Sequence, residues 1–248
     1  MKAKKHLGQH FLTDLFILSE IICAIQPKKT ENILEIGPGY GALTKMLAPL
    51  VDKLSVIEID QDCLETLNKF DNLIIHHQDV LEFDWSKIKP KSRIVGNLPY
   101  NIATEIFFKC LHAKDNILDM HFMMQKEVAS RLIANPGTKA YGKLTVMMQT
   151  QASVEVLFDI PPQAFDPMPK VMSSFCRIEP KRTISCNKKL LLLEKIVTAA
   201  FSRRRKQCHH NLKPWFKKSD LESLDISPNL RAEDITVEQY ESMVDNLL

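Results

Sequence analysis

Residues 32–41 read Asn-Ile-Leu-Glu-Ile-Gly-Pro-Gly-Tyr-Gly, a short apolar run followed by a tight glycine turn. The apolar run predicts a buried strand, and residues 42–50 after the turn predict a helix. A second apolar run over 54–57 predicts a strand that ends at Glu58. The spacing from Gly39 to Glu58 is 58 − 39 = 19 residues, about the distance at which an acid meets the ribose in a nucleotide-binding βαβ unit. The pattern therefore predicts an α/β fold with a ligand at the carboxyl ends of its strands.

The glycine turn also indicates which ligand such a fold would hold. Its glycines, Gly37, Gly39 and Gly41, are spaced G-x-G-x-G, whereas dinucleotide sites use G-x-G-x-x-G to place a pyrophosphate at a helix N-terminus. Glycine also lets the backbone approach a ligand closely. A tighter turn preceded by an acid, Glu35, fits S-adenosylmethionine better than a dinucleotide. The alternative interpretation is a plain turn that binds nothing.

An aspartate follows the third expected strand. The apolar residues 73–75 predict a strand that runs into Gln78-Asp79-Val80. Asp79 then falls at the same sheet edge as Glu58, where its carboxylate can accept a hydrogen bond from the adenine amino group of the cofactor. The alternative role for Asp79 is that of a helix or turn cap.

A second candidate site is the tetrad Asn97-Leu98-Pro99-Tyr100, which follows the apolar run 93–96. An adenine amino group is a poor nucleophile because its lone pair is delocalised into the ring. Two oxygen acceptors aimed at its N–H bonds would free that lone pair, and the Asn97 side chain and the Leu98 carbonyl can supply them. Pro99 restricts the conformation of Leu98, and Tyr100 offers a face on which a base can stack. The alternative is an ordinary strand-to-turn junction.

The residues before the glycine turn predict an arm and a helix. Residues 2–12 are basic, and a solvated tail is one interpretation, although Phe11 and Leu12 are unusually apolar for a tail. Thr13 or Asp14 can cap the helix that follows. The expected buried positions of that helix are Leu15, Leu18, Ile22 and Ile25.

The α/β alternation continues to about residue 180. Residues 144–151 favour a helix, and residues 154–157 and 174–178 predict closing strands. Between those strands lies the proline-rich stretch 161–170. We expect this stretch to be a stiff loop that does not pair as a strand and that holds Phe165 outward, where it can form a second wall of a base pocket.

The character of the chain changes after residue 180. Residues 181–218 contain twelve Lys or Arg against one acid, Glu194. Their pattern predicts helices over 188–201 and 202–212. This imbalance favours binding to phosphates over a merely solvated surface, and such binding depends steeply on salt. We therefore expect two domains: residues 1–180, which bind the cofactor, and residues 181–248, a basic helical domain that binds nucleic-acid phosphates.

The composition is that of a globular protein. Of the 248 residues, 45% are hydrophobic and 25% are charged, and the formal net charge is +3. Its six cysteines form no C-x-x-C pair, which predicts reduced thiols and no metal site. No apolar run approaches the roughly 18 residues that a membrane span needs. We therefore expect a cytoplasmic protein with no membrane partner.

Seven motifs together resemble the KsgA (RsmA) family of ribosomal RNA adenine dimethyltransferases, and the resemblance covers nearly the whole chain. In order, these motifs are residues 8–12 (GQHFL), 35–41 (EIGPGYG), 57–60 (IEID), 97–102 (NLPYNI), 125–132 (QKEVASRL), 161–171 (PPQAFDPMPKV) and 200–206 (AFSRRRK). The resemblance implies a Rossmann-like, S-adenosylmethionine-dependent methyltransferase domain with a small all-helical C-terminal domain. It further implies dimethylation of two adjacent adenines near the 3′ end of 16S rRNA, with the immature small ribosomal subunit as partner. We expect a monomer.

The resemblance also assigns site residues. Those implied for the S-adenosylmethionine site are His10, Leu12, Gly37, Gly39, Glu58, Asp79 and Asn97. Those implied for the target base are Asn97, Leu98 and Tyr100, with Phe165 as a second wall. The family usually has Asn where His10 stands and Asp where Met172 stands, so the contact at position 10 is expected through the backbone or a different donor. The sulfonium is already an activated methyl donor, so the implied reaction requires no metal.

Three alternatives stay open. An enzyme of the erythromycin-resistance type methylates large-subunit rRNA and carries a similar tetrad, but the motifs at 125–132 and 161–171 favour the small-subunit family. A DNA adenine methyltransferase would usually carry a separate target-recognition region, for which the chain has no stretch of sufficient length. A non-catalytic ribosome assembly factor on the same fold is the third.

Overall fold

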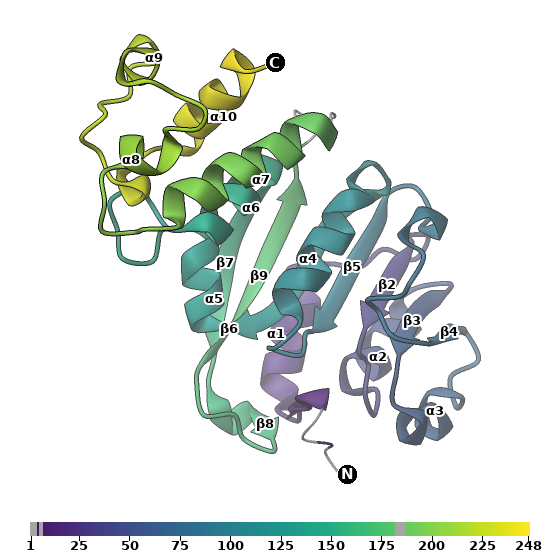
Figure 1. Ribbon diagram of the computed structural model, residues 1–248. Coiled ribbons are helices and arrows are strands. Elements are labelled where there is room, and N and C mark those ends of the chain that lie inside the picture. The colour runs from purple at the N-terminus through teal and green to yellow at the C-terminus, as the bar shows by residue number, and fades with distance from the viewer. Residues whose placement is uncertain (1–3, 5–6, 182–186) are drawn as a thin grey trace. The chain divides into compact units, whose positions relative to one another are not determined.

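The computed structural model describes residues 4, 7–181 and 187–248, and the chain divides into two compact units (Figure 1). The first comprises Met1–Ala129 and Glu155–Pro180, and the second comprises Ser130–Val154 and Lys181–Leu248. Residue 181 is thus a boundary between units. Residues 130–154, which the sequence-based division assigned to the first domain, group with the C-terminal helices.

A seven-stranded sheet with the order β4-β3-β2-β5-β6-β9-β7 organises the first unit (Figure 1). Its strands are β2 (Ile33–Ile36), β3 (Leu54–Glu58), β4 (Leu73–His77), β5 (Ser92–Asn97), β6 (Ile117–Gln125), β7 (Ala152–Ile160) and β9 (Ser173–Pro180). Neighbouring strands from β4 to β6 run parallel, and β9 is antiparallel to β6. The predicted α/β class is confirmed. The central strand β2 is buried at every position, as expected for a parallel strand covered on both faces.

Helices cover both faces of this sheet. They are α1 (Leu15–Ile25), α2 (Ala42–Leu47), α3 (Gln61–Leu67), α4 (Ala103–His112) and α5 (Lys126–Leu132), within which the chain passes to the second unit. In Figure 1, α1 and α2 lie behind the sheet and α4 lies in front of it. On the α4 side, Phe107 packs against Phe122 of β6 with ring centroids 5.6 Å apart. Because strands β2 to β6 run parallel, the loops that follow them emerge at the same edge of the sheet, between the two helical layers.

The first helix begins where the sequence predicts. The Asp14 side chain accepts hydrogen bonds from the backbone N–H groups of Phe16 and Ile17 and so caps α1. The buried face, however, differs from the expected one: Leu18, Ile21 and Ile25 are buried, whereas Leu15 is 73% exposed. Leu15 stands in the first turn, beyond the part of the helix that packs on the sheet.

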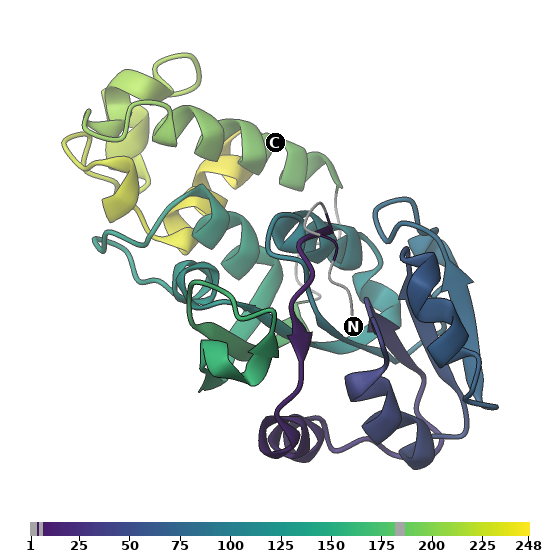
Figure 2. The same ribbon diagram turned by 90° about the horizontal axis from the view of Figure 1, so that it is seen from below.

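The proline-rich stretch 161–170 contains a strand, contrary to expectation. Phe165–Asp166 forms β8, which pairs antiparallel with β1 (Phe11–Leu12) of the N-terminal arm. In Figure 2 the purple arm runs alongside this green segment. Phe165 is only 4% exposed and belongs to the hydrophobic core. The prediction of an outward Phe165 is wrong because the arm supplies a backbone partner and burial of the apolar ring is favourable.

In the residues that the structure describes, the second unit is mainly helical and also includes the start of β7, residues 152–154. It contains α6 (Lys143–Gln151), α7 (Asn187–Phe201), α8 (Cys208–Leu212), α9 (Lys218–Ser223) and α10 (Val237–Asn246). Helix α6 packs against α7 and α10, which explains why residues 130–154 belong to this unit. The buried Tyr141 hydroxyl donates to the Ile235 carbonyl at 2.8 Å, and the buried Tyr240 hydroxyl donates to the Ala232 carbonyl at 2.9 Å.

One predicted helix is interrupted. A continuous helix over 202–212 was expected, but α7 ends at Phe201 and α8 begins only at Cys208. The Cys208 N–H instead donates to the Leu230 carbonyl at 2.7 Å, and Gln207 forms an isolated bridge with Arg231. These distant partners satisfy backbone groups that a helix would otherwise use. No helix among the described residues has the length and apolar content to cross a membrane.

Candidate active site

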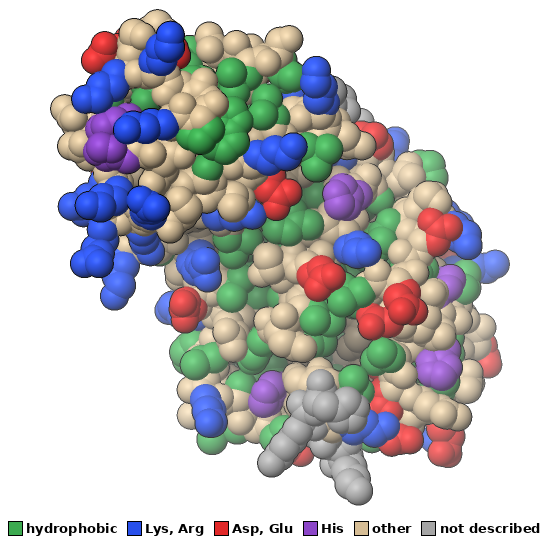
Figure 3. Space-filling model, viewed as in Figure 1, with side chains coloured by type: hydrophobic (Ala, Val, Ile, Leu, Met, Phe, Trp, Pro, Cys, Tyr) green, Lys and Arg blue, Asp and Glu red, His purple; other side chains and the backbone are tan. Residues whose placement is uncertain are grey.

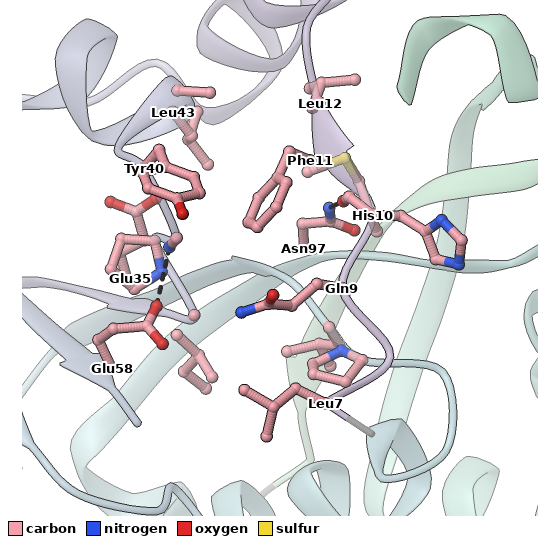
Figure 4. A pocket seen from close by; sticks show the side chains of 18 of the residues that line it. Leu7, Gln9, His10, Phe11, Leu12, Glu35, Tyr40, Leu43, Glu58 and Asn97 are labelled. Carbon is pink, nitrogen blue, oxygen red and sulfur yellow. Dashed lines mark hydrogen bonds between the residues drawn. The ribbon is translucent and has the colours of Figure 1, made fainter. Parts of the chain in front are cut away.

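The order of the sheet fixes where a ligand can bind. The strand order reverses between β2 and β5, and in open α/β sheets ligands bind in the crevice at the carboxyl ends of the strands at this switch point. A pocket of about 730 Å³ lies there. It is lined by the ends of β2, β3 and β5, by the turn after β4 and by the N-terminal arm (Figure 4). This volume is within the usual range of small-molecule sites.

The glycine turn and Glu58 form one wall of the pocket. Gly37 and Gly39 have φ angles of +63° and +55°, which glycine adopts without the cost that a side chain would impose. The Gly39 N–H donates to Glu58 Oε2 at 2.8 Å, and the Asp60 N–H donates to Glu58 Oε1 at 2.8 Å. Burial raises the pKa of Glu58, and the two backbone donors oppose that shift. Each carboxylate oxygen keeps a lone pair with which to accept from a ligand hydroxyl.

Glu35 lies beside the turn as a second, more deeply buried acid. It is 2% exposed, and its Oε2 accepts a hydrogen bond from the Thr44 hydroxyl at 2.7 Å. Burial raises the pKa of Glu35 to about 8, and the nearby charge of Glu58 adds to the shift. At neutral pH Glu35 is therefore mostly protonated, so it stands in the pocket wall as a neutral acid.

The N-terminal arm lies over the pocket and is not a solvated tail. Gln9 donates from Nε2 to Asp60 Oδ2 at 2.8 Å, and Lys4 donates from Nζ to Asp60 Oδ1 at 2.5 Å. The Phe11 ring points toward Tyr40 (Figure 4), with centroids 5.1 Å apart in an edge-on arrangement. A Cβ atom added at Gly39 would lie 2.8 Å from the Phe11 ring. Glycine at this position is therefore required both by the turn and by the arm.

Asn97 occupies the end of β5 and is oriented by the arm. Its side-chain Nδ2 donates to the backbone carbonyl of His10 at 2.7 Å (Figure 4). This bond uses the donor side of the amide and leaves Oδ1 as an acceptor. The Leu98 N–H donates to the Met123 carbonyl at 3.2 Å, which holds the tetrad on the neighbouring strand β6. Asn97 can therefore present an oxygen to a ligand.

Tyr100 is fixed at both its ring and its hydroxyl. Its hydroxyl and that of Ser173 are 2.7 Å apart and share a hydrogen bond. Its ring stacks against the His10 ring, with centroids 5.6 Å apart and planes 24° apart. Both residues are half-buried, so the stacked pair stands at the rim of the pocket.

The structure brings together nearly all of the residues singled out from the sequence. Those that line the pocket are His10, Leu12, Gly37, Gly39, Glu58, Asp79, Asn97, Leu98 and Tyr100. Asp79 also caps its own turn, since its Oδ1 accepts from the Leu81 N–H at 2.8 Å. Phe165 lies in the hydrophobic core instead, so it does not form the expected second wall.

Sequence reasoning did not assign Gln9, Phe11 or Tyr40 to the site, although all three line the pocket. The signal for Phe11 was its apolar character in an otherwise basic arm. Gln9 and Tyr40 fall within the motifs at 8–12 and 35–41, but their residue types do not predict contacts that depend on how the arm folds back. Among the described residues there is no group of three or more His, Cys, Asp or Glu arranged to hold a metal ion.

Comparison with solved structures defines the class of the fold. A dimethyladenosine transferase from Plasmodium falciparum superposes with a TM-score of 0.81 at 26% identity, over 96% of this chain and 97% of that protein. The 23S rRNA methyltransferase ErmE shares the fold, with a TM-score of 0.72 at 24% identity, over 96% of this chain and 99% of that protein. The first unit therefore has the Rossmann-like methyltransferase fold.

Sequence comparison narrows the class to a family. The ribosomal RNA adenine dimethylase family matches residues 1–247. The ribosomal RNA small subunit methyltransferase A of Neisseria meningitidis is 45% identical over 243 residues, which cover 96% of this chain and 94% of the relative. The chain belongs to the ribosomal RNA adenine dimethylase family.

Proposed function

We propose that this protein transfers methyl groups from S-adenosylmethionine to the N6 amino groups of two adjacent adenines near the 3′ end of 16S rRNA in the small ribosomal subunit. The proposal rests on one observation: the residues expected to bind the cofactor and those expected to hold the target base line the same pocket. The glycine turn with Glu58 lies at one side, and the tetrad that begins at Asn97 lies at the other. The small-subunit relative at 45% identity supports the choice of substrate.

The residues present fit S-adenosylmethionine. Glu58 offers oxygens to ribose hydroxyls, Asp79 stands at the pocket edge as a further acceptor, and Gly37 exposes backbone to the ligand. When bound, S-adenosylmethionine supplies a methyl group already activated by the sulfonium. The protein itself then has two tasks, which are to orient the target amine and to exclude water. The arm serves the second purpose, because Gln9 and Lys4 tie it to Asp60 over the pocket.

The tetrad supplies what the target amine needs. Asn97 Oδ1 and the Leu98 carbonyl accept from the two N–H bonds of the amine, which moves the nitrogen toward a tetrahedral geometry and frees its lone pair. Tyr100 provides a stacking face for the base, a contact worth roughly 1–3 kcal/mol. The base must leave its stack to reach this site, which favours an unpaired or terminal region of RNA.

A basic surface on the second unit fits the RNA backbone. Figure 3 shows Lys and Arg side chains gathered over the region of α8. The exposed residues of this basic surface are Arg203, Arg205, Lys206, Lys213, Lys217 and Lys218. Arg204 is also exposed, but it donates to Glu233 Oε2 at 2.6 Å and to the Lys139 carbonyl at 2.7 Å, and these bonds stabilise the second unit. Phosphate neutralisation by the others would hold the RNA without reading its sequence.

Two other functions are weaker candidates. Large-subunit methylation of the erythromycin-resistance type has support from the shared fold with ErmE, but at 24% identity that likeness shows the fold alone. A non-catalytic assembly factor would not need an oriented amide at Asn97 or acceptors around the pocket. A checkpoint role in ribosome assembly is compatible with catalysis.

Replacement of Asn97 by alanine tests the proposed chemistry. We expect the single-turnover methylation rate to fall by about a hundredfold or more, as when one preorganised polar contact to a transition state is removed. Affinity for the small subunit should change by less than threefold, because the basic surface is untouched. Tyr100→Phe keeps the stacking ring and is the matched control. A comparable loss of rate and affinity in Asn97→Ala would count against the assigned role.

A further inference from the structure

Consecutive side chains of the N-terminal arm point to opposite sides of its backbone. Figure 4 shows Phe11 directed toward Tyr40 and Glu35, at the wall formed by the glycine turn. The His10 ring points to the opposite side of the arm. This alternation is what an extended backbone produces. His10 lines the pocket, but its side chain therefore faces away from the glycine turn.

His10 contacts the residues proposed to hold the target base. Its ring stacks on Tyr100 at a centroid distance of 5.6 Å. Its backbone carbonyl accepts from Asn97 Nδ2 at 2.7 Å. Its Nδ1 lies 2.6 Å from the carbonyl oxygen of Pro167, which fastens the ring to the segment beside β8. The His10 ring thus lies against Tyr100, while the backbone of His10 holds Asn97.

A base cannot enter between the two rings. A flat base held between two rings needs two van der Waals layers of roughly 3.5 Å each, about 7 Å in all. The observed separation of the His10 and Tyr100 rings is 5.6 Å. The imidazole therefore occupies one face of Tyr100, and a base that stacks on this face must displace it.

We infer that the His10 side chain is a placeholder for the target base. It covers the stacking face of Tyr100 in the free protein and must rotate away when an adenine enters. The inference rests on the proposed function, since it takes Tyr100 as the stacking partner of the base. Rotation gives up the stack and the contact with Pro167, but the backbone bond to Asn97 can persist. A base enters only if its own stacking on Tyr100 and its hydrogen bonds outweigh the stacking and the Pro167 contact that His10 loses. His10 is therefore a specificity-determining residue.

The test measures insertion of the base into the site separately from methyl transfer. A short RNA with the sequence around the two adenines, carrying 2-aminopurine at the target position, reports unstacking and insertion by its fluorescence. The variants are His10→Ala and His10→Asn in the full-length protein. Asparagine keeps a donor for the Pro167 carbonyl but has no ring to stack. His112→Asn, on the exposed last turn of α4, is the matched control.

We expect both His10 variants to increase the equilibrium constant for insertion about fivefold, whereas His112→Asn leaves it unchanged. In a Tyr100→Ala background the same His10 substitutions should have an effect of less than twofold, because the contested face is gone. Unchanged or weaker insertion in both His10 variants would overturn the inference, as would an equal gain in the two backgrounds. Failure of the proposed function would look different: the probe would behave as expected while small subunits accept no methyl groups.

Discussion

Replacement of Glu35 by glutamine should stabilise the protein at neutral pH. Glu35 is almost fully buried, and burial raises its pKa from 4.5 to about 8. The unfolded chain releases this proton near pH 4.5, whereas the folded protein keeps it until about pH 8. Between these values the folded state binds more protons than the unfolded state, so stability falls as pH rises. Glutamine has a similar shape, can accept from Thr44 in place of the acid, and does not titrate.

The size of this stability difference follows from the pKa shift of Glu35. At pH 7 the unfolded acid is 2.5 pH units above its pKa of 4.5, and the folded acid, with its pKa of about 8, is still mostly protonated. At 1.36 kcal/mol per pH unit, the buried Glu35 lowers the free energy of unfolding of the wild-type protein by roughly 3 kcal/mol at pH 7. The Glu35→Gln variant does not suffer this loss. Near pH 4.5 the difference should fall below about 1 kcal/mol.

Urea unfolding at a series of pH values measures this difference directly, because a change in midpoint at constant slope reports stability. Glu65→Gln, at an exposed position of α3, is the control and should show no such trend. A stability difference that is the same at pH 5 and pH 7 would refute the reasoning. So would a Glu35→Gln variant that is less stable than the wild type at pH 7.

Two further predictions concern the arm and the basic surface. Gly39→Ala should weaken S-adenosylmethionine binding more than tenfold in calorimetry while costing about 1–2 kcal/mol of stability, because its Cβ would lie 2.8 Å from Phe11. Gly137→Ala is the control, since it also has a positive φ but no atom closer than 4.0 Å, and unchanged cofactor affinity in Gly39→Ala would contradict the account. Replacement of Arg203, Arg205 and Lys206 by glutamine should reduce the slope of log affinity against log salt by roughly 2–3 for a small-subunit RNA. Lys69→Gln should leave that slope unchanged, and an unaltered slope in the triple variant would show that this surface does not meet phosphate.

The parts of the site that could be predicted depend on short stretches of chain. A strand, a glycine turn and a helix follow one another within residues 33–47, so the local pattern is enough to place Gly37 and Gly39. Glu58 and Asn97 each end a parallel strand, and parallel strands bring their carboxyl ends to one edge. The meeting of these residues therefore follows from the sequence once the α/β alternation is recognised.

The rest depends on pairings between distant segments. Phe165 is buried because β8 pairs with β1, more than 150 residues earlier in the chain, and neither two-residue strand has a recognisable pattern of its own. The break before α8 arises from the contact of Cys208 with Leu230. The contacts of His10 and Gln9, and the raised pKa of Glu35, likewise exist only once the arm and the sheet have enclosed the pocket.

The most direct test of the central proposal is methyl transfer from labelled S-adenosylmethionine. Immature small ribosomal subunits, large subunits and duplex DNA would be offered separately, and the modified nucleoside would be identified after digestion. We expect N6,N6-dimethyladenosine in the small-subunit rRNA and no label in the other two substrates. Label in the large subunit, or no transfer by a protein that binds both cofactor and small subunit, would contradict it.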